Sequence, residues 1–355
     1  MRIAQIAPLT EAVPPRLYGG TERVVAYLTE ELVAMGHDVT LFASGDSRTS
    51  ARLRPLWPQA LRFDPEVVDI IGPHLMMMED VRRVSENFDI LHFHLDHWPF
   101  SLFTRQATPF LTTLHGRLDL AELPPIYARF PGVSVVSISE AQRAPLPQAN
   151  FVATIQHGLP EDLLRPLPVR PGYLAFLGRI CPEKGPDRAI EIARRSGITL
   201  KIAAKVDRVD QRYFEEKIRP LLDQPGIEFI GEIGDHEKGE FLSGALGLVM
   251  PIDWPEPFGL VMIEAMACGT PVIAFDRGSV REILEDGLTG LIVDDVAGAV
   301  VAAGRLAGLD RGKIRAAFER RFTARRMAEN YLALYERLAM AEACGRRRHG
   351  VRLAV

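Results

Sequence analysis

The chain alternates between two patterns of hydrophobic and polar positions. Short, almost continuously apolar runs are bounded by turn residues, and most are followed by a stretch with apolar residues at helical spacing. The opening "MRIAQIAP" is such a run, ended by Pro8, and a loop rich in proline and glycine follows it. Residues 21–36 then show one apolar helical face and a glycine stop, and "DVTLFAS" is the next run. The chain therefore opens as a βαβ unit.

The same alternation continues along the chain and restarts near Tyr173. Further runs that we interpret as strands are "FDILHFH", "FLTTLHG", "VSVVSIS", "YLAFLGRI", "TLKIAAKV", "IEFIGEI", "GLVMPI" and "GLTGLIVDD", and the segment "PEPFGLVMIEAMACGTPVIAF" gives a helix and then a strand. Near-continuous apolar strands that alternate with helices favour parallel sheets covered on both faces. We therefore expect an α/β protein with two domains in series, residues 1–165 and 166–322. A helix should follow over 323–341, and a disordered basic tail over 342–355.

Composition narrows the class of protein. A chain of 355 residues suits two domains, and its net charge of −4 gives no global basic bias, so we expect no nucleic-acid partner. Cys181, Cys268 and Cys344 show no disulfide or metal spacing, which favours a cytoplasmic location. The first apolar run is too short for a signal peptide, and no run reaches the length of a membrane span, although peripheral contact with a membrane stays open.

Two loops that precede helices contain residues suited to anions. Gly19 and Gly20 lie in "YGGT", where glycines permit close backbone approach and the free amides of a helix start attract negative charge. In "FLGRICPEKGPD", Arg179 and Lys184 follow a strand and precede a helix, and two cations at this place suit a diphosphate. The alternatives are a flexible turn and a solvated charged loop.

A third loop carries two glutamates. After the run "GLVMPI", Glu256 lies in a loop that continues through Phe258, Gly259 and Leu260 into a helix. Its carboxylate could accept hydrogen bonds from sugar hydroxyls, and the glycine turn could present bare amides. Glu264 lies inside the helix among apolar residues, where an unpaired carboxylate would be costly to bury. A ligand diol would offset that cost; the alternative is that Glu264 lies on the exposed face.

Histidines gather at two strand ends of the first half. His115 ends the run "FLTTLHG", and His92, His94 and His97 occur around the end of the run before it. Their spacing lacks a helical pair and no cysteine accompanies them, so we expect cleft or packing roles rather than a metal site. His157, in the proline-rich linker, is interpreted as structural.

Together, four segments resemble the retaining glycosyltransferases of family 4, which have the GT-B fold. They are "YGGTERVV", "FLGRICPEKGPD", "EPFGLVMIEAMACGTPVIA" and "GSVREILEDGLTGLIV", and the resemblance spans residues 1–340. It implies two Rossmann-like, doubly wound domains that face each other across a cleft. It further implies metal-independent transfer of a hexosyl group from a nucleotide diphosphate sugar to an acceptor hydroxyl, with no cofactor. The acceptor itself, whether a small molecule, a glycan or a lipid-linked sugar, is not implied.

The resemblance also implies roles for the candidate residues. The catalytic set would be the ligand of the sugar hydroxyls, the histidine beside the reacting carbon and the two diphosphate cations: Glu256, His115, Arg179 and Lys184. The donor-binding set would be the glycine pair, the loop that offers amides, and the ribose ligand: Gly19, Gly20, Phe258, Gly259, Leu260 and Glu264. The helix over 323–341 would return to the first domain.

One segment departs from the family pattern. Where many members have a glycine-rich turn, this chain has Ala203 to Asp207, which adds the cation Lys205. Lys205 would bind a phosphate, or else contact Asp207 or Asp210. The following segment resembles the region that meets the nucleobase, so Gly231 and Ile233 are candidates for lining that pocket.

Three other functions are compatible with parts of the sequence. A sugar-nucleotide 2-epimerase shares the architecture but would need acid and base carboxylates that are not evident beyond Glu256. A dinucleotide-dependent oxidoreductase lacks its glycine motif after the first strand, and Asp46 would be its only ribose-binding acid. A non-catalytic binding module is the remaining alternative. Acceptor contacts are expected from Pro73–Asp80 and Arg117–Tyr127, and Met76 to Met78 are expected in the core or at a lipid-binding lip.

Overall fold

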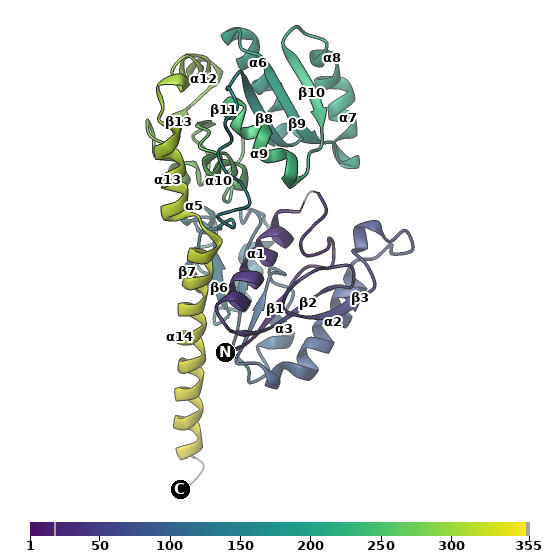
Figure 1. The fold of residues 1–355 in the computed structure, drawn as a ribbon. Helices are drawn as coiled ribbons and strands as arrows, with labels where there is room; N and C mark the ends of the chain where they lie inside the picture. Colours follow the sequence, from purple (N-terminus) through teal and green to yellow (C-terminus); the bar gives the residue numbers. More distant parts are fainter. Residues whose placement is uncertain (18, 353–355) are drawn as a thin grey trace. The chain divides into compact units, whose positions relative to one another are not determined.

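The structure, a computed structural model, describes residues 1–17 and 19–352, with side chains through Ala341. The chain divides into two compact units. The first unit comprises Met1–Ile138, Arg143–His157 and the chain from Ala324 on, and the second comprises Ser139–Gln142 and Gly158–Thr323. Figure 1 shows helices around a parallel sheet in each of them. The chain leaves the first unit at His157, whereas the sequence suggested a domain end at 165.

A seven-stranded parallel sheet forms the centre of the first unit, in the order β3-β2-β1-β4-β5-β6-β7. The strands are β1 (Arg2–Ile6), β2 (Asp38–Ser44), β3 (Arg52–Trp57), β4 (Ile90–Phe93), β5 (Phe110–Thr113), β6 (Ser134–Ser137) and β7 (Phe151–Thr154). The helices are α1 (Gly20–Ala34), α2 (Ile71–Val84), α3 (Phe100–Phe103), α4 (Leu123–Arg129) and α14 (Ala324–Arg352), with α5 (Glu140–Arg143) at the boundary of the units. The inner strands are buried apart from the first residue of β1, β2, β5 and β6, which explains their nearly continuous apolar runs.

A six-stranded parallel sheet forms the centre of the second unit, in the order β10-β9-β8-β11-β12-β13. The strands are β8 (Tyr173–Arg179), β9 (Leu200–Lys205), β10 (Ile227–Gly231), β11 (Ala245–Met250), β12 (Val272–Phe275) and β13 (Gly290–Val293). The helices are α6 (Pro186–Ser196), α7 (Gln211–Tyr213), α8 (Arg219–Leu222), α9 (Asp235–Ser243), α10 (Leu260–Ala267), α11 (Val280–Ile283), α12 (Val296–Ala303) and α13 (Arg311–Arg321). A π-helical stretch, Phe214–Ile218, joins α7 to α8.

In both sheets the order of the strands reverses near the middle, between β1 and β4 and between β8 and β11. The prediction of two Rossmann-like, doubly wound domains is therefore confirmed. The sequence did not reveal β3 and β7, which are the two edge strands of the first sheet. β3 contains two arginines and a proline, and every residue of β7 is half-buried. β3 therefore lacks the apolar run by which the inner strands were found, whereas β7, Phe-Val-Ala-Thr, contains a short one that the sequence analysis did not identify as a strand.

Helix α14 belongs to the first unit, although it follows the second in the chain. It packs against α1, and it buries the side chains of Met327, Tyr331 and Tyr335. Its backbone stays helical to Arg352, where we expected a disordered tail from 342. Residues 353–355 lie outside the described part of the chain, as do the side chains beyond Ala341.

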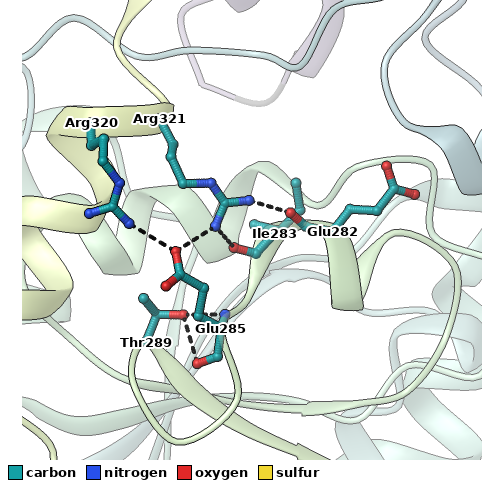
Figure 2. A network of polar contacts seen from close by, with 6 residues as sticks. All are labelled: Glu282, Ile283, Glu285, Thr289, Arg320 and Arg321. Carbon is teal, nitrogen blue, oxygen red and sulfur yellow. Dashed lines mark hydrogen bonds and ion pairs between the residues drawn. The ribbon is translucent and has the colours of Figure 1, made fainter.

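Two arginines at the end of α13 hold the loop between α11 and β13 (Figure 2). Arg321 donates to the carbonyls of Ile283 and Glu282 and lies 3.0 Å from the Glu285 carboxylate. Arg320 reaches only the same carboxylate oxygen, at 3.0 Å, among the contacts drawn in Figure 2. The side chain of Arg321 is 25% exposed and that of Arg320 is 58% exposed, so the two differ in burial as well as in partners.

We predict that Arg321→Ala destabilises the second unit and that the neighbouring Arg320→Ala does so much less. Loss of Arg321 leaves carbonyls without their donor, which should cost about 2 kcal/mol of unfolding free energy. An exposed ion pair such as that of Arg320 contributes less than about 1 kcal/mol. The measurement is urea unfolding at an unchanged m value. Equal losses in the two variants would contradict the role given to Arg321.

Candidate active site

The sheet of the second unit reverses its winding between β8 and β11. In open α/β sheets, ligands bind at the carboxyl ends of the two adjacent strands where the winding reverses. Arg179 is the last residue of β8. The loops that follow β8 and β11 are tied together, because the Asp253 amide donates to the Glu183 carbonyl at 2.8 Å. The candidate residues of both loops therefore lie at one edge of the sheet.

The two loops also meet through side chains. The Lys184 ammonium forms an ion pair with Oε2 of Glu256, and Nε1 of Trp254 donates to the same oxygen at 3.0 Å. The Lys184 nitrogen lies 4.9 Å from the centre of the Trp254 ring. Glu256 is only 7% exposed, so these donors offset the cost of burying its charge. Sequence reasoning missed Trp254, whose one signal was an aromatic side chain two residues before the glutamate.

Two glycines shape the loop around Glu256. Gly278 has a φ of +57°, and a Cβ there would lie 2.4 Å from the backbone nitrogen and oxygen of Glu256. Gly259 has a φ of +82° and immediately precedes α10. The Ser279 amide and hydroxyl donate to the carbonyls of Glu256 and Phe258, at 3.0 and 2.9 Å. Ser279 thus fixes two carbonyls of the loop, and the Met262 amide donates to the Gly259 carbonyl at 2.9 Å. The first amides of an α-helix, here from Leu260, generally have no acceptor within the helix.

Glu264 is buried and paired. It lies in α10 with 3% of its surface exposed, so the alternative of an exposed face is wrong. Its Oε1 lies 2.7 Å from Nζ of Lys238 in α9, and that ammonium is also 3.3 Å from Asp235. Lys238 therefore offsets the burial cost that a ligand diol was expected to offset. The sequence separation of the two residues concealed this pair.

The cations beside the switch point face carboxylates. Arg179 lies 3.5 Å from Asp210 and 3.8 Å from Asp207, and Lys205 lies 2.9 Å from Asp207. Arg179 and Lys205 are register partners in β8 and β9. The expected contact between Lys205 and Asp207 is confirmed, while a contact to phosphate stays a prediction. Burial raises the pKa of Asp210, against the opposing effect of Arg179.

The candidates for the nucleobase pocket lie at the same edge but farther from the switch point. Gly231 ends β10, the edge strand two positions from β8, and it has a φ of +82°. Ile233 is half-buried in the loop that leads to α9. Their position at and just after the end of β10 is beside the end of the neighbouring strand β9, where Lys205 lies.

In the first unit, His115 belongs to a cluster of buried polar groups at the carboxyl ends of β4 and β5. Its Nε2 lies 2.9 Å from Nδ1 of His94, and Nε2 of His94 lies 2.9 Å from Oε1 of Gln5 in β1. The His115 ring stacks on that of His157 with centroids 5.2 Å apart. Nδ1 of His115 is buried without a hydrogen-bond partner in the described structure. His157 is thus a packing partner of His115, as well as part of the linker.

His92 continues this cluster toward helix α14. Its Nδ1 lies 2.6 Å from the Tyr335 hydroxyl, and its Nε2 lies 2.7 Å from the Thr113 hydroxyl. Burial lowers the pKa of His92 and His94 well below the usual range and lowers the pKa of His115 to about 3, so the rings are neutral. Within residues 1–17 and 19–341, no group of His, Cys, Asp and Glu is arranged to hold a metal ion.

The glycine pair stands at the start of α1. Gly19 precedes the helix, and a Cβ there would lie 2.7 Å from Pro15, so a larger residue does not fit. Gly20 is the first residue of the helix. Glu22, in the first turn, is buried, and burial raises its pKa from 4.5 to about 7. Sequence reasoning did not single out Glu22, although it lies two residues after the glycines; Tyr18 lies outside the described residues.

The segments expected to contact an acceptor are partly helical. Pro73–Asp80 lies within α2, and Arg117–Tyr127 runs into α4. Met77 and Met78 are buried in the core, whereas Met76 is exposed, so the methionine run is mainly a core feature. Asp46 accepts hydrogen bonds from Ser44 and from the Ala60 amide, which is a turn-stabilising role.

Family models match both halves of the chain. "Glycosyltransferase Family 4" matches residues 18–174, and "Glycosyl transferases group 1" matches residues 165–321. The chain is a family 4-like glycosyltransferase with the GT-B fold. The four segments from which the sequence suggested this family fall inside the matched ranges.

Curated relatives of this glycosyltransferase are themselves named as glycosyl-transferring enzymes. Alpha-maltose-1-phosphate synthase of Mycolicibacterium smegmatis is 26% identical over 337 residues, which cover 81% of this chain and 84% of the relative. Phosphatidyl-myo-inositol mannosyltransferase of the same organism is 26% identical over 362 residues, covering 92% and 89%. The prediction of an enzyme that transfers glycosyl groups is confirmed.

Solved structures share the fold of this glycosyltransferase. Sucrose-phosphate synthase from Thermosynechococcus elongatus has a TM-score of 0.78 at 22% identity and covers 96% of this chain and 100% of its own. A glycosyltransferase involved in avilamycin A biosynthesis has a TM-score of 0.74 at 24% identity, covering 96% and 98%. Among the described residues, no helix has the length and apolar character required to cross a membrane.

We predict that Glu22 makes the stability of the first unit fall as the pH rises. Its pKa is near 7 when folded and about 4.5 otherwise, so the folded state binds the extra proton between these values. The stabilisation is complete below about pH 4.5 and is lost above about pH 7, to a limit of roughly 3 kcal/mol. Glu22→Gln should therefore show a smaller loss of unfolding free energy between pH 5 and 8 than the wild type.

The matched control for this measurement is Glu66→Gln, which changes an exposed glutamate of the same unit. Urea unfolding at the two pH values should show the wild-type dependence in this control. The same pH dependence in Glu22→Gln as in the wild type would contradict the role of Glu22.

Proposed function

We propose that this glycosyltransferase moves a hexosyl group from a nucleotide diphosphate sugar to an acceptor hydroxyl, with retention of configuration and without a metal ion. The observation that carries this proposal is the Lys184–Glu256 pair at the switch point, directly before the helix start at Gly259. This arrangement combines a cation, a carboxylate and the backbone amides of a helix start, which suit a phosphate bonded to a hydroxylated ring. A solved structure of the same fold, Anabaena HepE, contains UDP and glucose, which supports a donor of this kind.

The donor would be bound in parts by the loops of the second unit. Arg179, Lys184 and Lys205 would bind the diphosphate, because cations on adjacent strand ends pair with its oxygens. Backbone amides of Phe258, Gly259 and Leu260 would add hydrogen bonds there.

The remaining contacts would bind the sugar and the nucleoside. Glu256 would accept hydrogen bonds from the sugar hydroxyls. Glu264, oriented by Lys238, would accept from the ribose. Gly231 and Ile233 would line the base. The glycine pair at Gly19 and Gly20 and the ring of His115 would contribute from the first unit.

The chemistry follows from where charge develops. The bond between the anomeric carbon and the diphosphate breaks, and negative charge accumulates on the leaving oxygens. Arg179, Lys184 and the amides at the start of α10 stabilise that charge, which is the largest kind of catalytic contribution in such reactions. The acceptor oxygen attacks from the same face, and its proton passes to the leaving phosphate. No separate protein nucleophile is required by this route.

We predict that Glu256→Ala abolishes transfer but keeps affinity for the nucleoside diphosphate. The carboxylate would bond the sugar, so its loss should lower kcat/KM by about 100-fold or more, at about 1.5–3 kcal/mol for each lost bond. UDP-, GDP- and ADP-sugars are first screened by thermal shift, because specific binders raise stability by mass action. Transfer from the best donor to an acceptor panel is then measured with and without EDTA.

Asp253→Ala is the matched control, because it removes an exposed carboxylate from the same loop. It should leave transfer within about twofold, a change too small to mark a binding contact. Loss of diphosphate binding together with transfer in Glu256→Ala would contradict the sugar-binding role. A donor that is epimerised in the absence of acceptor would overturn the transfer reaction itself, and a large loss in EDTA would overturn metal independence.

We predict that Arg179→Ala raises the Kd of the nucleoside diphosphate by about 10- to 100-fold, since a charge-assisted contact is worth about 1.5–3 kcal/mol. Arg208→Ala is the matched control, because Arg208 is an exposed arginine in the loop after β9 and its loss changes net charge equally. Isothermal titration with the diphosphate measures both. Equal weakening in the two variants would show a general charge effect and would remove Arg179 from the site.

A further inference from the structure

We propose that Tyr335, on helix α14, is a positioning residue that sets the tautomer of His115 through Gln5 and His94. His115 would thereby present a bare Nδ1 as a hydrogen-bond acceptor for a substrate hydroxyl. The role toward substrate rests on the proposed function, whereas the tautomer is a property of the protein alone.

The orientation of the Gln5 amide determines which nitrogen of each neighbouring histidine carries a hydrogen. Its Nε2 donates to the Tyr335 hydroxyl at 3.0 Å, and its Oε1 therefore faces Nε2 of His94 at 2.9 Å. An amide oxygen only accepts, so Nε2 of His94 carries a hydrogen. Because the buried His94 ring is neutral, its Nδ1 has none and must accept. The hydrogen between His94 and His115 consequently belongs to Nε2 of His115.

This assignment leaves Nδ1 of His115 without a hydrogen. The ring is neutral, so it carries one hydrogen only, and Nε2 already has it. Nδ1 is buried with no hydrogen-bond partner in the described structure. The stacked ring of His157 restricts the plane in which it lies. Nδ1 of His115 is therefore a hydrogen-bond acceptor with a defined direction. It can accept from a hydroxyl group, but it cannot pair with a carbonyl or another group that only accepts.

Tyr335 connects the hydrogen bonds of Gln5, His94 and His115 to those of His92, Thr113 and Tyr331. It accepts from Gln5, so its own hydrogen is free to go to Nδ1 of His92, 2.6 Å away. His92 then donates from Nε2 to the Thr113 hydroxyl at 2.7 Å, and Thr113 donates to Tyr331 at 2.8 Å. Every bond in the series runs in one direction, from His115 through Gln5 and Tyr335 to Tyr331, so a reversal at one member requires a reversal at all of them.

The opposite order is the competing arrangement. It would require the Gln5 amide to turn by 180°, so that its nitrogen faced His94. All the other hydrogens would then reverse, and Nδ1 of His115 would carry a hydrogen. A buried N–H without an acceptor is among the rarest defects in folded proteins, which disfavours this order. The two arrangements make opposite statements about one nitrogen atom and can therefore be separated by experiment.

The experiment is ¹⁵N NMR of the full chain with labelled histidine, near neutral pH and without any ligand. Nitrogen shifts distinguish a bare imidazole nitrogen from a protonated one, and the His115→Asn spectrum identifies the His115 signals by their absence. The expected result is a hydrogen on Nε2 and none on Nδ1. A hydrogen on Nδ1 of His115 would overturn the proposal, whatever the protein's activity.

Tyr335→Phe tests the link itself. The variant removes the hydroxyl that accepts from the Gln5 amide nitrogen, so the present orientation of this amide loses a hydrogen bond and His115 should become a mixture of both tautomers. Tyr331→Phe is the matched control, because it removes a hydroxyl from the same helix at the far end of the series and should leave the His115 tautomer unchanged. An unchanged tautomer in Tyr335→Phe, or an equal change in Tyr331→Phe, would overturn the role of Tyr335.

A second variant and a kinetic comparison complete the test. Gln5→Met breaks the same link from the other side, and it should reproduce the mixed tautomer even if Tyr335→Phe fails to fold. With the donor found by the thermal-shift screen, Tyr335→Phe should lower kcat/KM about 5- to 10-fold and Tyr331→Phe less than twofold. A mixed tautomer with unchanged turnover would overturn the catalytic relevance of His115, but a chain that transfers no sugar at all would contradict only the proposed function.

Discussion

In the second unit, one largely buried ion pair joins the loops that follow two adjacent parallel strands, β8 and β11, between which the strand order of the sheet reverses. Lys184 comes from the β8 loop and Glu256 from the β11 loop, and Trp254 completes the hydrogen bonding. Removing one partner of such a pair leaves an uncompensated buried charge, which costs far more than the pair contributes to stability. The loops are therefore held together by the same groups that would meet a ligand. The close packing of Gly278 on the backbone of Glu256 keeps the pair in place.

The two units share one topology but differ in the charge of the side chains at the carboxyl edge of their sheets. Each sheet reverses at its centre, and each collects polar groups at the carboxyl edge. The second unit gathers cations and carboxylates there, which suits a charged ligand. The first unit gathers imidazoles that burial keeps neutral, so it offers directed hydrogen bonds rather than charge.

The sequence predicted the inner strands, the doubly wound fold and the candidate loops, because each of these predictions depends on short segments with a recognisable pattern of residues. A buried strand is a run of apolar residues, and the turn at Gly259 needs a glycine because its φ is positive. Pairs between distant segments could not be predicted. Lys238 and Glu264 lie 26 positions apart, and Gln5 and Tyr335 lie 330 apart. Such contacts depend on strand order and helix packing, which hydrophobic periodicity does not contain.

Helix α14 has a consequence for how the protein is made. The first unit buries Met327, Tyr331 and Tyr335, which are translated after the whole of the second unit. During synthesis, the first unit lacks helix α14 until the end of the chain has been made. The second unit has all of its segments as soon as Thr323 emerges from the ribosome. The later unit can thus be the earlier to finish folding, and a chaperone that recognises exposed apolar surface would encounter the first.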